Sequence, residues 1–468
     1  MSSAWLESYG DVNTYDFAAD RPILMDGFVH NAEGFANSCN QPGATCSGSF
    51  SDTTGERAMG YYDEKFLNYY YYMAAQFAVS DRWFSPVASK SIDNRIATFT
   101  GGTTQGLVKD PGGDDHLPQL GITTIFKELT NANVSWKIYY TVTQGFCQDE
   151  DDCPTNGNSR YPATDFSALS DSYTYLRDNP TPGSTTSCPA PLQPSSVAPI
   201  NDSTNSFCID LNHIAPISQY YTDLTNGTVP SFAFIEAGYG NNDEHPGSGQ
   251  SVLQGQAEVA KVVNALIDST SWADSVFFFS YDEGGGPYDH VPPVPGSSNS
   301  NTNTTALGAT PPDIGSIAVN PDTTSQQPNL YFPCIPDPAG TATTHCDLES
   351  GDPGAVSTDA AAENGFAAQL GFRLPNIVIS PFTRRHYVSH TPMDHTAVIK
   401  FVESRFINGS PSLTNRDAAQ PDLLDFFDFN NVPWSNAPTK LAPPTPYSDN
   451  GASCTPSTFA PAVRRSSK

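Results

Sequence analysis

The sequence is poor in basic residues: 22 Lys and Arg stand against 50 Asp and Glu among 468 residues, and the formal net charge is −28. Nucleic acids and anionic membrane surfaces are bound through basic faces, so we expect no nucleic-acid partner. Solubility is the simplest explanation of the acidic charge. The sequence also has no run of about 18 consecutive apolar residues, so we expect no transmembrane helix.

Metal-binding Cys-x-x-Cys spacing is absent as well. Eight of the nine cysteines instead lie close to another cysteine in the sequence, within polar stretches, and Cys454 is left over. The neighbours are Cys39 with Cys46, Cys147 with Cys153, Cys188 with Cys208, and Cys334 with Cys346. Such pairs favour local disulfide bonds. Five N-glycosylation sequons accompany them, at Asn133, Asn201, Asn226, Asn303 and Asn408. Together these features predict a secreted, extracellular glycoprotein, although 1-MSSAWLESYG-10 lacks the basic start and apolar segment of a signal peptide.

Apolar stretches rich in β-branched and aromatic residues alternate with segments of helical periodicity. Buried strands are predicted at 134–140, 231–238, 275–281 and 375–381. Helices are predicted at 63–80, 251–267 and 394–406. This alternation predicts an α/β fold with a largely parallel sheet, in which ligands bind beyond the carboxyl ends of the strands.

Two long stretches, about 148–205 and about 296–351, are rich in Ser, Thr, Asn, Pro and Gly and contain no periodic segment. We interpret them as disulfide-stapled loop insertions within one catalytic domain, 1–434. Residues 435–468 form a Pro-rich C-terminal tail.

The stretch 89-SKSIDNRIATFTGG-102 places Ser91 at the start of a predicted short helix, just ahead of Asn94 and Arg95. Backbone N–H groups and the helix dipole attract negative charge at such an end. The position suits a nucleophile that attacks phosphorus, with Asn94 and backbone amides holding the phosphoryl oxygens. An ordinary helix-capping serine is the alternative interpretation.

The stretch 279-FSYDEGGGPYDHVPPVPG-296 ends an apolar strand with acidic residues, a histidine and three consecutive glycines. Asp282 and Glu283 are candidate ligands of a divalent cation, and His290 is a candidate ligand or proton donor. A solvent-facing turn is the alternative. His245 and His395 also fall near strand-to-helix junctions, where an α/β site would gather them.

Several of these segments, in the same order and spacing, resemble a phosphoesterase family that contains phospholipases C of bacteria and fungi and a group of acid phosphatases. The resemblance covers about Met25 to Phe406; its segments are 59-MGYY-62, 81-DRWFSPVASKSIDNRIATFTGGT-103, 123-TTIFKEL-129, 134-VSWKIYY-140, 243-DEHPG-247, 281-YDEGGGPYDHVPP-293, 372-FRLPNIVISPFTR-384 and 394-DHTAVIKFVESRF-406. It implies an alkaline-phosphatase-like α/β fold, with the sheet between layers of helices, and metal-assisted attack on a phosphoester.

The resemblance also implies roles for individual residues. Ser91 matches the family nucleophile that forms a phospho-enzyme, and Asn94 matches the asparagine that holds the phosphate. Asp282 and Glu283 match the acidic pair that binds the metal together with Ser91, and His245 and His290 match active-site histidines. We further expect substrate contacts from three residues, Arg95, Asp289 and His395. The metal could be Ca, Mn or Zn.

Family members open with a Glu-Asn-x-Ser-Phe-Asp segment that completes the metal site, and this chain is expected to lack it. The leading expectation is a phospholipase C-like enzyme acting on phospholipid head groups. Alternatives are an acid phosphatase acting on small phosphoesters and a catalytically impaired secreted binding protein. The sequence does not favour a serine esterase or a zincin metalloprotease, because it contains no G-x-S-x-G or H-E-x-x-H motif. The sequence does not predict an oligomeric state.

Overall fold

A computed structural model of the chain describes residues 8, 11, 25–43, 52–102, 124–141, 213–238, 242–245, 251–291, 293, 370–407, 409 and 412–442. The predicted insertions and almost all of the C-terminal tail lie outside these residues. So does every cysteine except Cys39, and the predicted disulfide pairs therefore stay predictions. No helix in the described parts of the chain is both long and apolar enough to span a membrane.

The described strands form three sheets. The largest has the order β6-β7-β1-β8, with strands Phe277–Ser280, Asn376–Ile379, Ala78–Ser80 and Tyr387–Ser389. A second sheet has the order β4-β3-β5, with strands Ile214–Pro216, Trp136–Tyr140 and Phe232–Glu236. The third pairs β2 (Trp83–Phe84) with β9 (Met393–Asp394).

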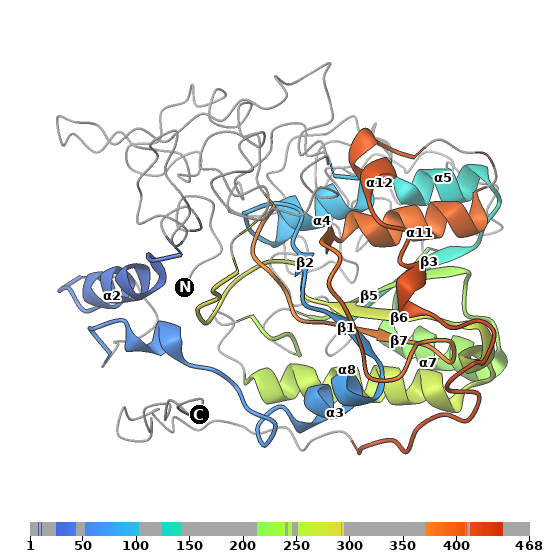
Figure 1. Cartoon of the computed structure of the whole chain (residues 1–468), viewed down its shortest axis with the longest axis horizontal. Coiled ribbons are helices and arrows are strands. Elements are labelled where there is room, and N and C mark those ends of the chain that lie inside the picture. Colours follow the sequence, from blue (N-terminus) through green and yellow to red (C-terminus); the bar gives the residue numbers. More distant parts are fainter. Residues whose placement is uncertain are drawn as a thin grey trace, which may run out of the picture.

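Helices cover the strands on two sides (Figure 1). On the lower side in that view lie α3 (Asn68–Gln76), α7 (Ile217–Asn226) and α8 (Val252–Asp268). On the upper side lie α4 (Ser91–Phe99), α5 (Ile125–Asn131), α11 (Thr396–Phe406) and α12 (Asn415–Ala419). The remaining described elements are α2 (Phe28–Cys39) and the 3₁₀ turns η1 (Glu56–Met59), η3 (Thr270–Asp274) and η5 (Leu424–Phe426).

Alternation along the strands explains the layers, because successive side chains point to opposite faces. Phe277 and Phe279 of β6 pack into the apolar cluster formed with α3, α7 and α8, whereas Phe278 packs on the opposite side beside Ala397 of α11. In β5, Ala233 and Ile235 join the first cluster, and Phe232 and Phe234 join the cluster of α4, α5 and α11. The apolar strands are thus covered on both faces.

The α/β class predicted from the sequence is confirmed, and four of the six strand pairings among the described residues are parallel, although the largest sheet is mixed. Parallel pairs join β1 to β8, β2 to β9, and β3 to both β4 and β5. Strand β7 is antiparallel to both of its neighbours, β1 and β6. An apolar run predicts burial on both faces but contains no signal for strand direction, which the chain connections determine.

The predicted helix 63–80 is shorter in the structure. Its start is displaced because the Asp63 carboxylate accepts hydrogen bonds from the backbone N–H groups of Lys65 and Phe66, which makes a turn. Its end is displaced because Ala78–Ser80 pairs with Tyr387–Ser389 as a strand. Tertiary pairing therefore overrides the local helical pattern.

Three carboxyl groups meet between α5, α11 and α12. The N–H of Leu413 donates to Oε1 of Glu403 and to Oδ2 of Asp417, each at 3.0 Å, so the two carboxyls lie side by side. Burial, then the neighbouring Asp417, raises the pKa of Glu403 above its ordinary value. Burial raises the pKa of Glu128 to about 7, with a further contribution from Asp417. The Glu403–Asp417 pair therefore keeps a shared proton near neutrality.

Replacing Glu403 with Gln should flatten the dependence of stability on pH. The folded state holds the Glu403 proton at pH values where the unfolded carboxyl, with its ordinary pKa of 4.5, has lost it. The free energy of unfolding of the unmodified chain should therefore fall as the pH rises from 4.5 through neutrality. We expect Glu403→Gln to remove about 1–2 kcal/mol of that fall, because the amide cannot ionise.

Urea denaturation at pH 5 and pH 8 measures this difference. Glu64→Gln is the control. Glu64 is exposed, so this substitution should leave the dependence of stability on pH unchanged. Parallel pH profiles for all three proteins would show that the carboxyl pair does not retain its proton.

Candidate active site

Ser91 is the first residue of α4, as the sequence predicts. The residue before it, Lys90, has an extended backbone and gives the helix no side-chain cap, so α4 has backbone N–H groups at this end without intrahelical partners. In the first turn Asp93 is fully buried and accepts a hydrogen bond from the hydroxyl of Ser89 at 2.5 Å. Ser91 itself is partly exposed.

The amide of Asn94 fixes the loop that leads to Ser91. Its Oδ1 accepts from the N–H of Val87 at 2.8 Å, and its Nδ2 donates to the carbonyls of Ser89 at 2.8 Å and Lys90 at 3.0 Å. The side chain is fully buried. Asn94 therefore orients Ser91 in this structure, and its predicted contact with a phosphoryl group stays a prediction.

Arg95 joins the ends of two sheets to α4. Its Nη2 lies 2.7 Å from Oε1 of Glu236, the last residue of β5, and 3.3 Å from Oδ2 of Asp282, which follows β6. Ser91 lies close enough to Asp282 for its hydroxyl to help lower the pKa of that carboxyl. The structure thus brings together three residues singled out from the sequence, Ser91, Arg95 and Asp282.

The charge of Asp282 is stabilised by these neighbours. Burial alone would raise the pKa of this carboxyl, but the Arg95 guanidinium and the nearby Ser91 hydroxyl outweigh burial, and the pKa is lowered. The side chain as a whole is 32% exposed. Its Oδ2 is nevertheless buried and accepts no hydrogen bond, although the guanidinium is close. Asp282 is therefore an ionised carboxylate at the edge of an open space.

Glu283 and His245 form a second pair beside the first. The Nε2 of His245 lies 3.7 Å from Oε1 of Glu283, and the two side chains are 39% and 11% exposed. A backbone turn holds the histidine, since its N–H donates to Oδ1 of Asp243 at 2.9 Å. The imidazole is thus near the acidic pair and open to solvent.

His395 is buried behind Asp282 rather than exposed. Its Nδ1 lies 3.1 Å from Oγ1 of Thr98, and its Nε2 lies 3.4 Å from Oγ of Ser280. Burial lowers the pKa of His395 to about 4, although Asp394 and Asp282 favour its charged form. The imidazole ring is therefore uncharged at neutral pH. It packs behind Asp282 against Thr98 and Ser280.

Asp289 and His290 lie on the loop beyond the triple glycine. Asp289 accepts two hydrogen bonds from Arg373, from Nε at 2.9 Å and from Nη2 at 2.8 Å. The side chain of His290 is 75% exposed and has Nδ1 3.7 Å from Asp289. No contact in the described residues joins this pair to Ser91 or Asp282, so their predicted roles stay predictions.

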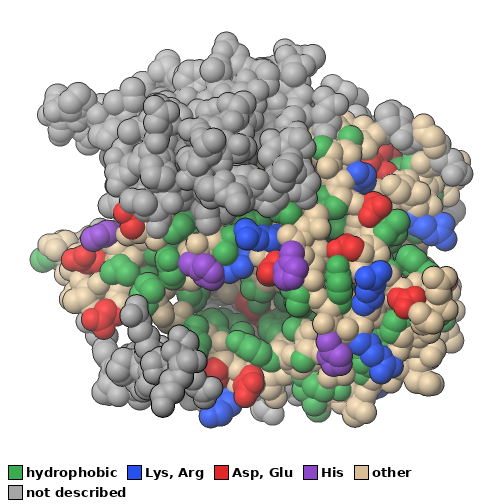
Figure 2. Space-filling model, in the orientation of Figure 1, with side chains coloured by type: hydrophobic (Ala, Val, Ile, Leu, Met, Phe, Trp, Pro, Cys, Tyr) green, Lys and Arg blue, Asp and Glu red, His purple; other side chains and the backbone are tan. Residues whose placement is uncertain are grey.

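A hollow opens on one face of the molecule (Figure 2). An acidic side chain is visible within it, hydrophobic side chains form its lower wall, and basic and histidine side chains gather above it. This mixture of charges and apolar surface is suited to a ligand with both an anionic and an apolar part.

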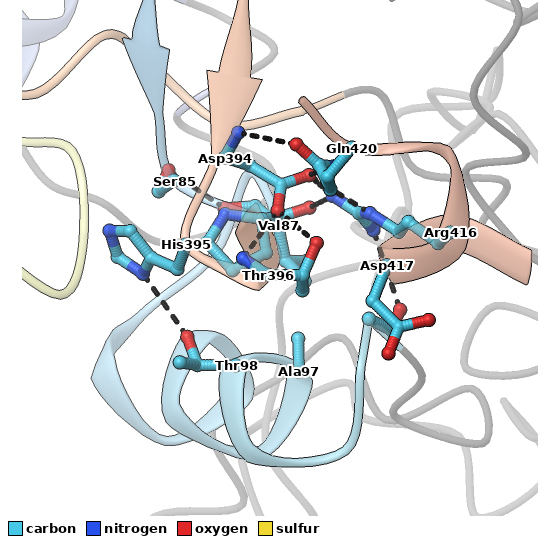
Figure 3. A network of polar contacts seen from close by, with 12 residues as sticks. Ser85, Val87, Ala97, Thr98, Asp394, His395, Thr396, Arg416, Asp417 and Gln420 are labelled. Atoms are coloured by element: carbon cyan, nitrogen blue, oxygen red, sulfur yellow. Dashed lines mark hydrogen bonds and ion pairs between the residues drawn. The ribbon is translucent and has the colours of Figure 1, made fainter. Parts of the chain in front are cut away.

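A buried polar network around Asp394 and Arg416 lies against α4 and the segment before it (Figure 3). Oδ2 of Asp394 accepts from Nη2 of Arg416 at 2.9 Å and from Nε2 of Gln420 at 2.9 Å. Arg416 also donates to the carbonyls of Pro86 at 2.6 Å and Gly102 at 3.4 Å, on either side of α4. Arg416 and Asp394 are 1% and 0% exposed. The pair therefore links α11 and α12 to both ends of the Ser91 segment.

Glu236 is a site residue that the sequence interpretation missed. It ends an apolar strand in the same manner as Asp282, so the rule that selected Asp282 could also have selected it. No local sequence pattern marks Arg373 or Arg416 as residues that support the site, because their hydrogen-bond partners are distant in sequence.

The described residues include no group of three or more His, Cys, Asp and Glu side chains arranged to hold a metal ion. The ligands predicted in this chain are two carboxylates and a hydroxyl, and oxygen donors suit hard divalent cations. The buried Oδ2 of Asp282, which accepts no hydrogen bond, fits a cation. The donor chemistry is therefore compatible with the predicted metal.

Comparison with known proteins identifies the class. The phosphoesterase family model matches residues 4–407, and the chain belongs to this family. It is 26% identical over 403 residues to a non-hemolytic phospholipase C of Burkholderia pseudomallei, covering 83% of this chain and 48% of the relative. It is 23% identical over 388 residues to phospholipase C B of Mycobacterium tuberculosis, covering 81% and 58%.

A plant protein shows similar coverage: the chain is 24% identical over 438 residues to non-specific phospholipase C1 of Arabidopsis thaliana, covering 89% of this chain and 58% of the relative. The chain thus spans only about half the length of these relatives.

Replacing Arg416 with Met should destabilise the fold strongly, because it leaves the buried Asp394 carboxylate without its counter-charge. We expect a loss of about 3–5 kcal/mol in the free energy of unfolding, measured by urea denaturation. Lys261→Met is the control: it removes an exposed ion pair with Glu258 and should cost less than about 1 kcal/mol. Equal losses in the two variants would contradict a supporting role for the buried pair.

Proposed function

We propose that this chain hydrolyses phosphoesters as a phospholipase C-like enzyme, with phospholipid head groups as substrates and Ser91 as the nucleophile. The observation that supports it most directly is the ion pair of Arg95 with Asp282, which holds this carboxylate near the start of α4, where Ser91 lies. Family membership and the phospholipase C names of three relatives agree with this proposal.

In the first step the Ser91 hydroxyl gives its proton to the Asp282 carboxylate, its oxygen forms a bond to phosphorus, and the bond to the leaving alcohol breaks. Asp282 suits this role because it is ionised and lies near Ser91. The N–H groups at the start of α4 and the Arg95 guanidinium favour the negative charge of the phosphoryl oxygens. Asn94 keeps the Ser91 loop in place through its three backbone hydrogen bonds.

His245 is the proposed proton donor to the leaving alcohol, because its ring is open to solvent beside the acidic pair. The alcohol departs as diacylglycerol if the substrate is a phospholipid. In the second step the same imidazole takes a proton from the water that bonds to phosphorus, the Asp282 carboxyl returns its proton to the Ser91 oxygen, and the phosphorylated head group leaves. His290 is exposed, and it would act as the proton donor only if its loop approached the substrate.

A divalent cation held by Asp282, Glu283 and the Ser91 hydroxyl would lower the pKa of that hydroxyl and neutralise charge on the phosphate. Its identity, Ca, Mn or Zn, is left to experiment.

We also propose that the protein is secreted and glycosylated, with disulfide bonds in its loop insertions. Two of the five sequon asparagines, Asn133 and Asn226, are exposed among the described residues, as a glycan requires.

Replacing Ser91 with Ala should abolish hydrolysis of p-nitrophenyl phosphorylcholine, with a loss of at least about a thousandfold in kcat. The unmodified protein should trap a phosphorylcholine group on Ser91, seen by mass spectrometry of acid-quenched reactions. Ser231→Ala is the control, since Ser231 is exposed and precedes β5 at the end opposite Glu236. Full activity of Ser91→Ala would exclude this nucleophile. Faster turnover of p-nitrophenyl phosphate would instead favour a phosphomonoesterase.

Removing divalent ions with a chelator should stop the reaction, and adding back Ca, Mn or Zn one at a time should identify the metal. Glu283→Gln should raise the metal concentration needed for half-maximal activity about tenfold or more, because it removes one charged ligand. Calorimetric titration of metal into both proteins measures the same change without substrate. Glu258→Gln, on α8, is the control. Undiminished hydrolysis in excess chelator would rule out the metal.

A further inference from the structure

The carboxylate of Glu244, one residue before His245, is held by two buried phenols. The hydroxyl of Tyr70 in α3 donates to its Oε1 at 2.6 Å, and the hydroxyl of Tyr281 donates to its Oε2. Tyr281 follows β6 and immediately precedes Asp282 and Glu283. Each oxygen of Glu244 is therefore bound by a donor from a different element.

The surroundings of Tyr70 and Glu244 leave these groups little freedom. The Tyr70 ring stacks on Phe279 of β6 with centroids 4.9 Å apart and planes inclined by 25°. Oε1 of Gln256 in α8 accepts the backbone N–H of Tyr70 at 3.3 Å. A Cβ atom at Gly255 would lie only 2.2 Å from Cγ of Glu244, so the carboxylate packs directly on the backbone of α8.

The protonation states preserve at least one of the two hydrogen bonds. Burial, more than the neighbouring groups, raises the pKa of Tyr70 and of Tyr281 well above the ordinary value, so both phenols remain donors at neutral pH. Burial likewise raises the pKa of Glu244, to about 7, against the lowering effect of the two phenols. Whether or not Glu244 is protonated, at least one of its oxygens accepts a hydrogen bond.

We propose that Tyr70, Glu244 and Tyr281 form a clamp that positions His245 against Glu283. The clamp ties the residue before His245 to the residue before the acidic pair, and so sets the separation of the imidazole and Glu283, now 3.7 Å. All three are positioning residues, because they act through His245. The inference deepens the proposed function, which gives His245 its role as proton donor.

Tyr70→Phe tests the clamp with little change of shape. It removes one hydrogen bond to Glu244 and should lower kcat about tenfold with KM changed less than about twofold, because a displaced catalytic group weakens the chemical step more than binding. Tyr69→Phe is the matched control. It removes a comparable buried hydrogen bond, from Tyr69 to Asn264 at 3.0 Å, on the same helix, and should leave kcat unchanged. Equal kcat values in the two variants would overturn the clamp.

A double-mutant cycle separates positioning from general weakening of the fold. If Tyr70 acts through His245, then adding Tyr70→Phe to His245→Ala should cause no further loss in kcat. Losses that multiply would mean that Tyr70 acts independently of His245, which overturns the proposal.

Hydrogen exchange tests the clamp without relying on turnover. Amides of the peptide that contains residues 242–245 should exchange about tenfold faster in Tyr70→Phe than in Tyr69→Phe. Unchanged exchange would overturn the clamp even if the protein is active. Absence of hydrolysis by the unmodified protein, with the expected exchange difference, would overturn the proposed function and leave the clamp standing.

Discussion

The ion pairs of Arg95 are the interaction on which the site depends. The guanidinium lies between Glu236 and Asp282, which end strands of two separate sheets, and it comes from the helix that begins with Ser91. Without this cation, the two neighbouring carboxylates would lack a counter-charge, at a cost of several kcal/mol. Arg95 thus holds the ends of strands from both sheets next to the start of α4 and helps to keep Asp282 ionised.

This central interaction needs support, because a buried cation between two acids can shift unless its own backbone is fixed. Asn94 fixes the start of α4, and the Arg416–Asp394 pair reaches the carbonyls of Pro86 and Gly102 at either side of the helix. These groups are buried and hydrogen-bonded, so they resist displacement more than surface contacts would. The position of Ser91 is therefore determined by the buried polar contacts around α4 as well as by the apolar core.

Much of this arrangement could be predicted from local sequence. The apolar strands ending at Glu236 and before Asp282 were visible because β-branched and aromatic residues lie between turn-forming ones. The short helix beginning at Ser91 was also predicted from the local sequence. Pairings across the chain were not visible: Tyr70 and Glu244 are 174 residues apart, and Arg416 and Pro86 are 330 apart. Neither the direction of β7 nor the burial of His395 has a local signature, since both depend on which elements meet in the fold.

The buried His395 shows how much the meaning of a residue type depends on its surroundings. Two histidines follow strands or open helices in similar sequence contexts, yet His245 is open to solvent beside Glu283 while His395 is enclosed by Thr98 and Ser280. Enclosure disfavours the charged imidazolium, so His395 suits packing and hydrogen bonding near Asp282. His245 lies at the surface beside Glu283, with its side chain 39% exposed. The different surroundings of the two histidines therefore follow from the fold, which sequence position alone does not determine.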